Sequence, residues 1–282
     1  MIANEDLVVH TTNDYYCSGR RATVNGNFCE RKPLKMVSAG SCYLPKDNPS
    51  KPRGEDAHFL WLKKNTMGVA DGVGGWAKKG IDAGEYAREL MRNSLTAVLN
   101  EPQGAVDPKR VLNSAFLNTK ERGSSTACIL TLRDDNHLHC ANVGDSGFMV
   151  FRDKKLVYKS EAQQRGFNFP FQLGNSEGSD KPSCAKEIKV AVKAGDIVVV
   201  GTDGLFDNMY ESEIEELLQK GKASSTEDLA ILIAEYALYN SFDRFALSPF
   251  AKASRKAGFQ HKGGKIDDIT VLVSIMKPLN TT

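Results

Sequence analysis

Short apolar runs alternate with polar segments along most of the chain, and two stretches show helical spacing instead. Three runs near the start have strand character: 37–44, 57–62 and 67–70. Between 86 and 116, apolar side chains recur at intervals near 3.6 residues. This spacing predicts two helices, each packing one face on a sheet.

Four strand-like runs then follow one another closely: 125–132, 137–144, 146–152 and 155–160. Tight polar turns separate the first pair and the last pair, which predicts an antiparallel meander. The pattern continues with a strand at 195–202, a short helix opened by a capping box of Ser212 and Glu215, helices at 226–241 and 247–257, and a last strand at 269–276. Many antiparallel strands with helices in two blocks indicate an α+β fold.

The domain organisation is simple, because neither an internal repeat nor a Pro/Gly-rich linker divides the sequence. Residues 1–36 are polar and lack sustained periodicity, so we expect a loosely ordered N-terminal lead-in. The apolar patterning extends from there almost to the C-terminus. We therefore predict one catalytic domain over residues 37–278.

Composition excludes several classes of partner and site. The 282 residues carry 37 basic and 35 acidic side chains, too balanced for a nucleic-acid-binding surface. No apolar run approaches the roughly 18 residues of a membrane span. Six cysteines show no spacing typical of zinc, and Cys128 and Cys140 lie in apolar runs, which indicates buried free thiols in a reducing, intracellular compartment.

Carboxylates stand at the ends of predicted strands in five places, each beside a glycine or a turn: Glu55-Asp56, Asp71-Gly72, Asp145, Asp203 with Asp207, and Asp267-Asp268. Any one of them could be ordinary turn chemistry. Five together exceed what turns require, because a buried carboxylate is costly unless it is paired or bound to metal. Oxygen ligands without nearby His or Cys favour Mn²⁺ or Mg²⁺ over zinc.

Six motifs occur in a characteristic order: GEDA, GVADGVGGW, GSSTACIL, ANVGDSG, TDGLFDN and DDITVLVS. As an ordered set they resemble the signature of the type 2C metal-dependent serine/threonine protein phosphatases, the PPM family. The segments QQRGFNFPFQL, SPFA and GGK resemble the branch found in mitochondria and chloroplasts. The resemblance implies a four-layer αββα sandwich of two antiparallel β-sheets flanked by helices.

The resemblance also implies roles for individual residues. Asp71 would bridge two ions, with the carbonyl of Gly72 reaching one of them. Glu55 would bind one ion, and Asp203 and Asp267 the other. The remaining motif positions imply Asp56 holding metal-bound waters, Asp145 (with Asp207 as a further candidate) at a weaker third metal, and Asp268 as a neighbour and not a ligand.

Three positions depart from the family pattern. Val73 stands in the loop where typical members carry a histidine thought to protonate the leaving alkoxide, so another acid or water must serve. Lys51 and Arg53 both lie near the place of the usual phosphate-binding arginine, and either could hold the substrate phosphate. Gly147 replaces the arginine of the common Gly-Asp-Ser-Arg sequence.

The predicted function is hydrolysis of phosphoserine and phosphothreonine in proteins by a water or hydroxide that bridges two Mn²⁺ or Mg²⁺ ions. The alternative is an inactive relative that binds phosphoproteins as a scaffold. An aspartyl-nucleophile phosphatase is excluded, because Val69 and Gly201 stand where its second aspartate is needed. We expect a monomer. The family branch suggests a mitochondrion or plastid, whereas the acidic N-terminus, unlike a transit peptide, leaves the cytoplasm open.

Overall fold

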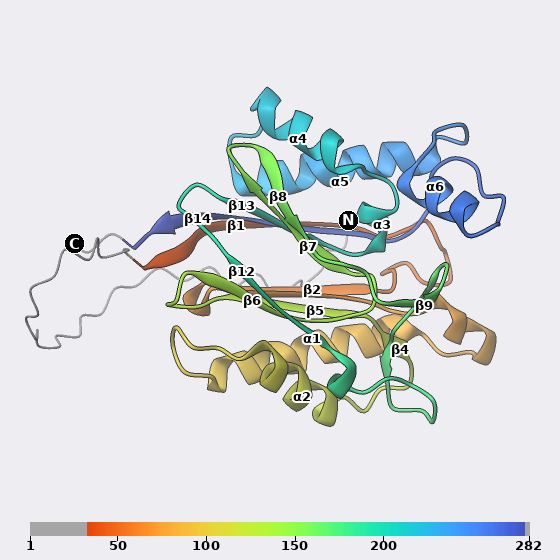
Figure 1. The fold of residues 1–282 in the computed structure, drawn as a ribbon. Helices are drawn as coiled ribbons and strands as arrows, with labels where there is room; N and C mark the ends of the chain where they lie inside the picture. The colour runs from red at the N-terminus through yellow and green to blue at the C-terminus, as the bar shows by residue number, and fades with distance from the viewer. Residues whose placement is uncertain (1–32, 280–282) are drawn as a thin grey trace, which may run out of the picture.

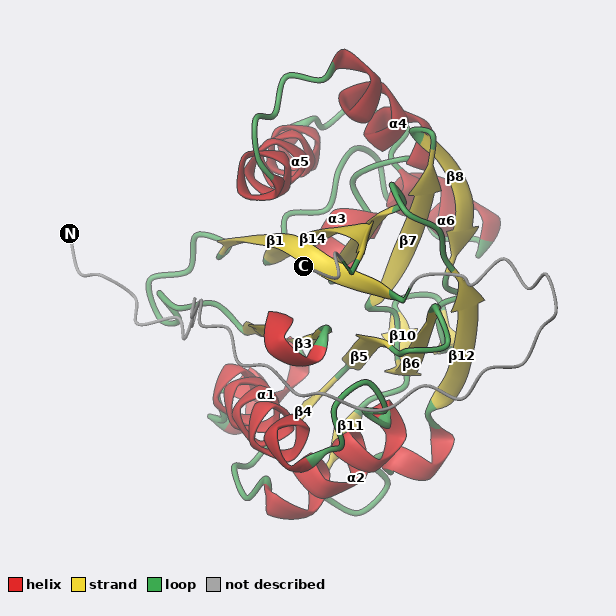
Figure 2. Ribbon diagram, turned by 90° about the vertical axis from the view of Figure 1, so that its left-hand side faces the viewer, coloured by secondary structure: helices red, strands yellow, loops and turns green. Residues whose placement is uncertain are grey.

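Two antiparallel sheets lie face to face, and helices cover the outer face of each (Figures 1 and 2). The computed structural model describes residues 33–279. From one side to the other, the layers are α4 and α5, the first sheet, the second sheet, and α1 with α2. This arrangement confirms the predicted α+β, four-layer αββα sandwich. None of the described helices is both long and apolar enough to cross a membrane.

The first sheet has five strands, in the order β1 (Leu34–Leu44), β14 (Ile269–Pro278), β13 (Ile197–Gly201), β7 (Gly147–Arg152) and β8 (Lys155–Lys159). Strand β1 begins earlier than predicted, because Leu34 already pairs with Pro278. Residues 34–36 therefore belong to the sheet and not to the lead-in. The rest of the predicted lead-in, residues 1–32, lies outside the described residues.

The second sheet also has five strands, in the order β12 (Lys186–Ala191), β6 (His137–Val143), β5 (Ala127–Leu132), β3 (Thr66–Asp71) and β2 (Asp56–Trp61). Two short ladders join β9 (Gln164–Gly166) to β10 (Phe169–Pro170) and β11 (Leu173–Gly174) to β4 (Ser124–Ser125).

The predicted continuous meander from 125 to 160 is wrong. Strands β5 and β6 form one hairpin and β7 and β8 another, but β6 and β7 belong to different sheets. The chain crosses between the sheets at Gly144-Asp145-Ser146, where Gly144 has φ +96°, a conformation that favours glycine. Asp145 is therefore carried by a crossover between layers.

The described residues form six α-helices: α1 (Ala83–Asn100), α2 (Pro108–Asn118), α3 (Asp203–Phe206), α4 (Glu211–Lys220), α5 (Thr226–Phe242) and α6 (Pro249–Lys256). The predicted capping box of Ser212 and Glu215 is wrong. Helix α4 starts at Glu211, and the side chain of Glu213 accepts a hydrogen bond from the backbone N–H of Tyr210 at 2.6 Å. Ser212 lies inside the first turn.

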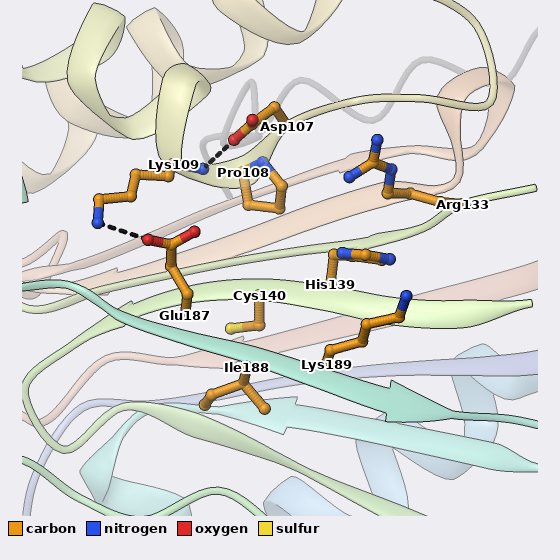
Figure 3. A pocket seen from close by; sticks show the side chains of 9 residues that line it. All are labelled: Asp107, Pro108, Lys109, Arg133, His139, Cys140, Glu187, Ile188 and Lys189. Carbon is orange, nitrogen blue, oxygen red and sulfur yellow. Dashed lines mark hydrogen bonds and ion pairs between the residues drawn. The ribbon is translucent and has the colours of Figure 1, made fainter. Parts of the chain in front are cut away.

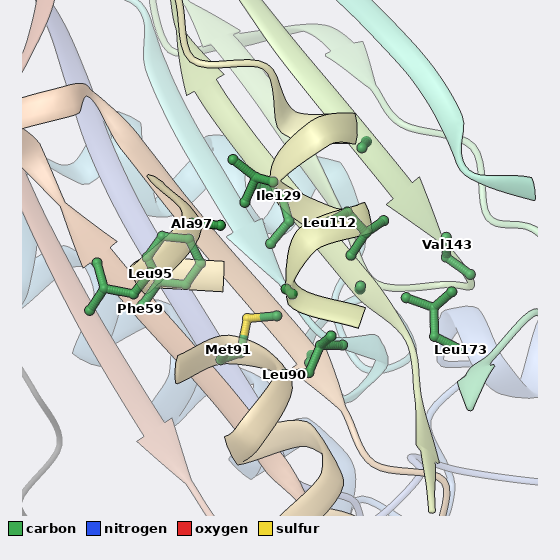
Figure 4. Packing of buried hydrophobic residues seen from close by; sticks show 14 of the residues in the cluster. Phe59, Leu90, Met91, Leu95, Ala97, Leu112, Ile129, Val143 and Leu173 are labelled. Carbon is green, nitrogen blue, oxygen red and sulfur yellow. The ribbon is translucent and has the colours of Figure 1, made fainter. Parts of the chain in front are cut away.

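Three apolar layers hold the sandwich together. Successive side chains along each strand point to opposite faces of the sheet and so contribute to two different layers. In β5, Ile129 faces α1 and α2, while Cys128 and Leu130 face the first sheet. In β7, Phe148 points between the sheets and Met149 points toward α5. Both faces of these central strands are covered, which explains why their sequences read as nearly continuous apolar runs. Figure 4 shows the layer between α1, α2 and the second sheet.

Candidate metal centre

Carboxylates from both sheets meet at one end of the sandwich. Asp56 opens β2 and Asp71 closes β3, and the two are cross-strand partners. Asp203 lies two residues after β13, at the start of α3, and Asp267 lies two residues before β14, the antiparallel neighbour of β13, so their positions also adjoin. We call the following residues the carboxylate cluster: Glu55, Asp56, Asp71, Asp145, Asp203, Asp207, Asp267 and Asp268.

Asp71 interacts electrostatically with several members of this cluster. Although the residue keeps some solvent exposure, its surroundings desolvate the carboxyl group, and this desolvation raises its pKa well above the usual range. The charges of Asp203, Asp56, Asp267 and Asp145 raise it further. Like charges this close cannot all ionise without a compensating cation.

Two lysines supply part of that positive charge, and sequence reasoning did not identify either of them. The ammonium group of Lys46 lies 2.9 Å from Asp267 Oδ1 and 3.4 Å from both Glu55 Oε2 and Asp268 Oδ2. Lys265 contacts Asp203 and lies 3.1 Å from Asp267 Oδ2. Burial alone would raise the pKa of Asp267, but the charges of Lys265 and Lys46 lower it.

The donor chemistry of the cluster fits a hard divalent cation. One carboxylate oxygen of Asp56, Asp145 and Asp203 (Oδ1 in each case) is buried and has no hydrogen-bond partner within the described part of the chain. In the geometry of the structure, however, no three His, Cys, Asp or Glu residues between 33 and 279 form a set that could hold a metal ion. The metal-ligand assignments therefore stay predictions.

Within the cluster, Asp56 and Asp268 tie the two sheets together. Asp56 Oδ2 accepts hydrogen bonds from the hydroxyls of Thr202 at 2.8 Å and Thr270 at 2.7 Å, both on the opposite sheet's side. Asp268 accepts from the backbone N–H groups of Glu55 at 3.0 Å and Lys46 at 2.9 Å. These bonds make Asp268 a support for the segment that carries Glu55.

Asp145 and Asp207 belong to the cluster through Asp203, whose charge acts on both carboxyl groups. Burial, followed by the charge of Asp203, raises the pKa of Asp145 to about 6, while Gln164 donates a 2.7 Å hydrogen bond to its Oδ2. Burial also raises the pKa of Asp207 to about 7, although Lys265, 2.9 Å from Asp207 Oδ2, opposes the shift.

Gly72 occupies a position that admits no side chain. Its N–H donates to the carbonyl of Glu55 at 3.0 Å. A Cβ atom at this position would lie only 2.7 Å from the carbonyl oxygens of both Ala83 and Glu55. The backbone between Asp71 and Val73 is therefore packed tightly beside Glu55.

The two candidates for holding the substrate phosphate are placed differently. Lys51 lies 2.5 Å from Glu55 Oε1 and its side chain is only 11% exposed. Arg53 is 62% exposed and lies 3.5 Å from Glu85 on α1. Val73 brings no ionisable group to the loop after Asp71, and its N–H donates to the carbonyl of Ser124 at 2.9 Å.

A separate pocket of about 180 Å³ lies between the start of α2, β6 and β12 (Figure 3), and its lining includes Arg133, His139 and Lys189. None of the predicted site residues lines it. His139, on the interior strand β6, also pairs with Asp135 at 3.0 Å. His261 interacts with the carbonyl of Gly264 at 3.0 Å.

Comparisons with known proteins show which family the chain resembles. The family model for stage II sporulation protein E (SpoIIE) matches residues 64–275. The chain is 49% identical to probable protein phosphatase 2C 55 of Arabidopsis thaliana, a match that covers 86% of this chain and 52% of that protein. It is 39% identical to the protein phosphatase PTC7 homolog of Danio rerio, with 86% of this chain and 84% of that protein covered.

One solved structure is also close to the whole domain. The X-ray structure of the photosystem II phosphatase PBCP has a TM-score of 0.80 and 31% sequence identity, and the match covers 87% of this chain and 100% of that one. Fold, motifs and relatives therefore agree: the chain belongs to the type 2C (PPM) family of protein phosphatases. It spans about half the length of the Arabidopsis relative.

Proposed function

We propose that this protein is a metal-dependent serine/threonine protein phosphatase that works with two Mn²⁺ or Mg²⁺ ions. The observation that carries the proposal is the convergence of the carboxylate cluster, in which buried oxygens of Asp56, Asp145 and Asp203 lack partners among the described residues. A cluster of this kind is unfavourable without cations and suited to binding them. Membership of the PPM family supports the same conclusion.

The proposed ligands are those that the motifs imply. Glu55 and the carbonyl of Gly72 would hold one ion, Asp203 and Asp267 would hold the other, and Asp71 would contribute to both. Bound divalent ions would lower the pKa of a water molecule and neutralise charge on the phosphoryl group. Asp56, held by two threonine hydroxyls, would keep an oxygen free to orient water.

The remaining residues of the site would position the substrate. Lys51 is the better candidate for a contact with the phosphate, because it lies beside Glu55, whereas Arg53 is exposed and turned toward Glu85. Since the side chain of Val73 has no ionisable group, solvent water would protonate the leaving alkoxide. Phosphorylated proteins are the proposed substrates, with a mitochondrion or plastid as the proposed location and a monomer as the proposed state.

The second candidate function is a phosphoprotein-binding scaffold without turnover, and Val73 is the observation that favours it. Purified protein incubated with p-nitrophenyl phosphate and with a phosphothreonine peptide separates the two. Turnover that requires millimolar Mn²⁺ and stops with chelator supports the phosphatase. Binding of the peptide without turnover would favour the scaffold.

A matched pair of variants assigns the turnover to the carboxylate cluster. Asp203→Asn should abolish turnover, because it removes a charge that the ions need. Asp153→Asn makes the same chemical change at an exposed turn between β7 and β8 and should leave turnover unchanged. Near-normal activity of Asp203→Asn would refute the ligand assignment.

A further inference from the structure

Lys265 joins three members of the carboxylate cluster from two segments of the chain: Asp203 and Asp207, at the start and the C-cap of α3, and Asp267, just before β14. Its ammonium group contacts Asp203, lies 2.9 Å from Asp207 Oδ2 and lies 3.1 Å from Asp267 Oδ2. The Lys265 side chain is only 15% exposed. A lysine with three carboxylate partners and so little solvent exposure balances the negative charge of the cluster and is not an ordinary surface side chain.

Two hydrogen bonds fix the backbone of Lys265 and so hold the base of its side chain beside the carboxylates. The side-chain amide of Asn208 accepts from the Lys265 N–H and donates to its carbonyl, both at 2.8 Å. The preceding Gly264 packs against the end of α5, where a Cβ would lie 2.2 Å from the carbonyl oxygen of Asn240. The ammonium group also lies 5.2 Å from the ring centroid of Phe250.

Asp207 gives Lys265 an anchor outside the proposed ligand pair. Asp203 and Asp267 are the proposed ligands of one metal ion, whereas Asp207 was predicted only as a further candidate for a weaker third ion. Lys265 can keep its contact with Asp207 while the other two carboxylates bind metal. A fixed ammonium group there would repel a further divalent cation beside Asp203 and Asp145.

Lys46 does not compete for this role. It lies on the side of Glu55 and Asp268, its side chain is 25% exposed, and its contacts do not include Asp207 or Asp145. Among residues 33–279, Asp267 is the one ion-pair partner that the two lysines share, and each approaches a different oxygen of it.

We infer that Lys265 is a tethered cation that takes the place of a third metal ion, so that the protein binds two divalent ions at the carboxylate cluster and not three. This inference rests on the two-ion function proposed above. Lys265 is a positioning residue in this account: it neutralises Asp207 and excludes a further ion, and it does not touch the reacting phosphate.

The test is a count of bound ions that does not depend on activity. Wild-type protein and variants are dialysed against rising free Mn²⁺, and bound manganese per chain is measured by elemental analysis. We expect two ions for wild type, three for Lys265→Gln, and two for Lys265→Arg, which keeps the charge. Lys262→Gln is the matched control, since Lys262 is an exposed neighbour with no ion pair in the described residues, and it should bind two.

Thermal unfolding of the metal-free proteins gives a second readout. Lys265→Gln should have a lower melting temperature than wild type, because Asp203, Asp207 and Asp267 lose their shared counter-charge, whereas Lys262→Gln should match wild type. Addition of Mn²⁺ should raise the melting temperature of Lys265→Gln more than that of wild type.

Several results would overturn the inference. Three ions on the wild-type protein would do so even if Lys265→Gln failed to fold, as would an unchanged count of two in a folded Lys265→Gln. A wild-type protein that hydrolyses phosphate esters and binds three ions would contradict this inference but remain consistent with the proposed phosphatase activity. A wild-type protein that binds no manganese would instead remove the proposed function, and the inference with it.

Discussion

The carboxylate cluster and the apolar layer between the sheets obey opposite rules. In the apolar layer, Leu130 and Phe148 are fully buried among side chains that lose contact with water, and this burial stabilises the fold. In the cluster, Asp71 and Asp203 bring like charges together, and this repulsion costs stability until cations arrive. Residues of the apolar layer stabilise the fold, whereas residues of the cluster serve the proposed activity. Mutation should therefore lower stability in the apolar layer and turnover in the cluster.

The largest expected effect is on turnover. Asp71→Asn should lower kcat/KM by about 10³-fold or more, because divalent ions supply several kcal/mol of charge stabilisation in such sites and each factor of ten is about 1.4 kcal/mol. Urea denaturation should show a metal-free variant at least as stable as wild type, since a repulsive charge has been removed. A variant that is inactive because it is unfolded would contradict this separation.

The apolar layer should respond in the reverse way. Leu130→Ala should lower the free energy of unfolding by about 2–5 kcal/mol, the range for deleting a buried leucine side chain. Activity per folded molecule should stay near that of wild type, because Leu130 lies between the sheets and away from the cluster. Urea titration together with an assay of the folded fraction measures both quantities.

The pH dependence of stability should distinguish metal-free from metal-bound protein. The pKa of Asp145 is raised to about 6 and that of Asp207 to about 7, both above the usual value of 3.8. The folded metal-free protein therefore binds more protons than the unfolded chain over roughly pH 4 to 7, and its stability should fall as pH rises through that window. The raised pKa of Asp145 alone, about 6 against 3.8, corresponds to a loss of about 3 kcal/mol, since one pKa unit is worth about 1.4 kcal/mol.

Saturating Mn²⁺ should reverse the sign of that dependence, because metal ions bind the deprotonated carboxylates. Melting temperatures recorded from pH 4.5 to 7.5, with and without Mn²⁺, provide the comparison. A metal-free protein whose stability rises across this range would show that the cluster carries no net repulsion.

The smallest expected effect concerns substrate binding. Lys51→Gln should raise KM for a phosphopeptide by about tenfold, or about 1.4 kcal/mol, the scale of one charge-assisted contact. Arg53→Gln should change KM by less than about twofold, because its side chain points toward Glu85 and exposed ion pairs contribute little. Equal effects of the two substitutions on KM would remove the distinction between them.

The sequence predicts some features of this molecule well and others poorly, for physical reasons. Strand ends carry carboxylates beside glycines, and that local pattern suffices to find Asp71 and Asp203 as members of one cluster. The positions of Lys46 and Lys265 depend on contacts between remote segments, which leave no periodic trace in the sequence. The GGK segment before Asp267 is recognisable in the sequence as a motif, but only the fold brings its lysine to Asp207.

The crossover at Asp145 was missed for a related reason. A hairpin turn and a turn between sheets have the same local composition, so Gly144-Asp145 looked like one more tight turn of a meander. Only the pairing of β7 with β13 reveals the change of sheet. The start of α4 was misplaced because Ser212 matches a local capping pattern, whereas the N-cap residue is Tyr210.

The most direct test of the account is a crystal structure of the protein grown with Mn²⁺ and analysed by anomalous scattering. The account predicts two strong peaks within the carboxylate cluster, with the carboxylate of Asp71 between them and Lys265 still beside Asp207. Peaks that lie elsewhere, or a cluster that binds no manganese while the enzyme turns over, would contradict it.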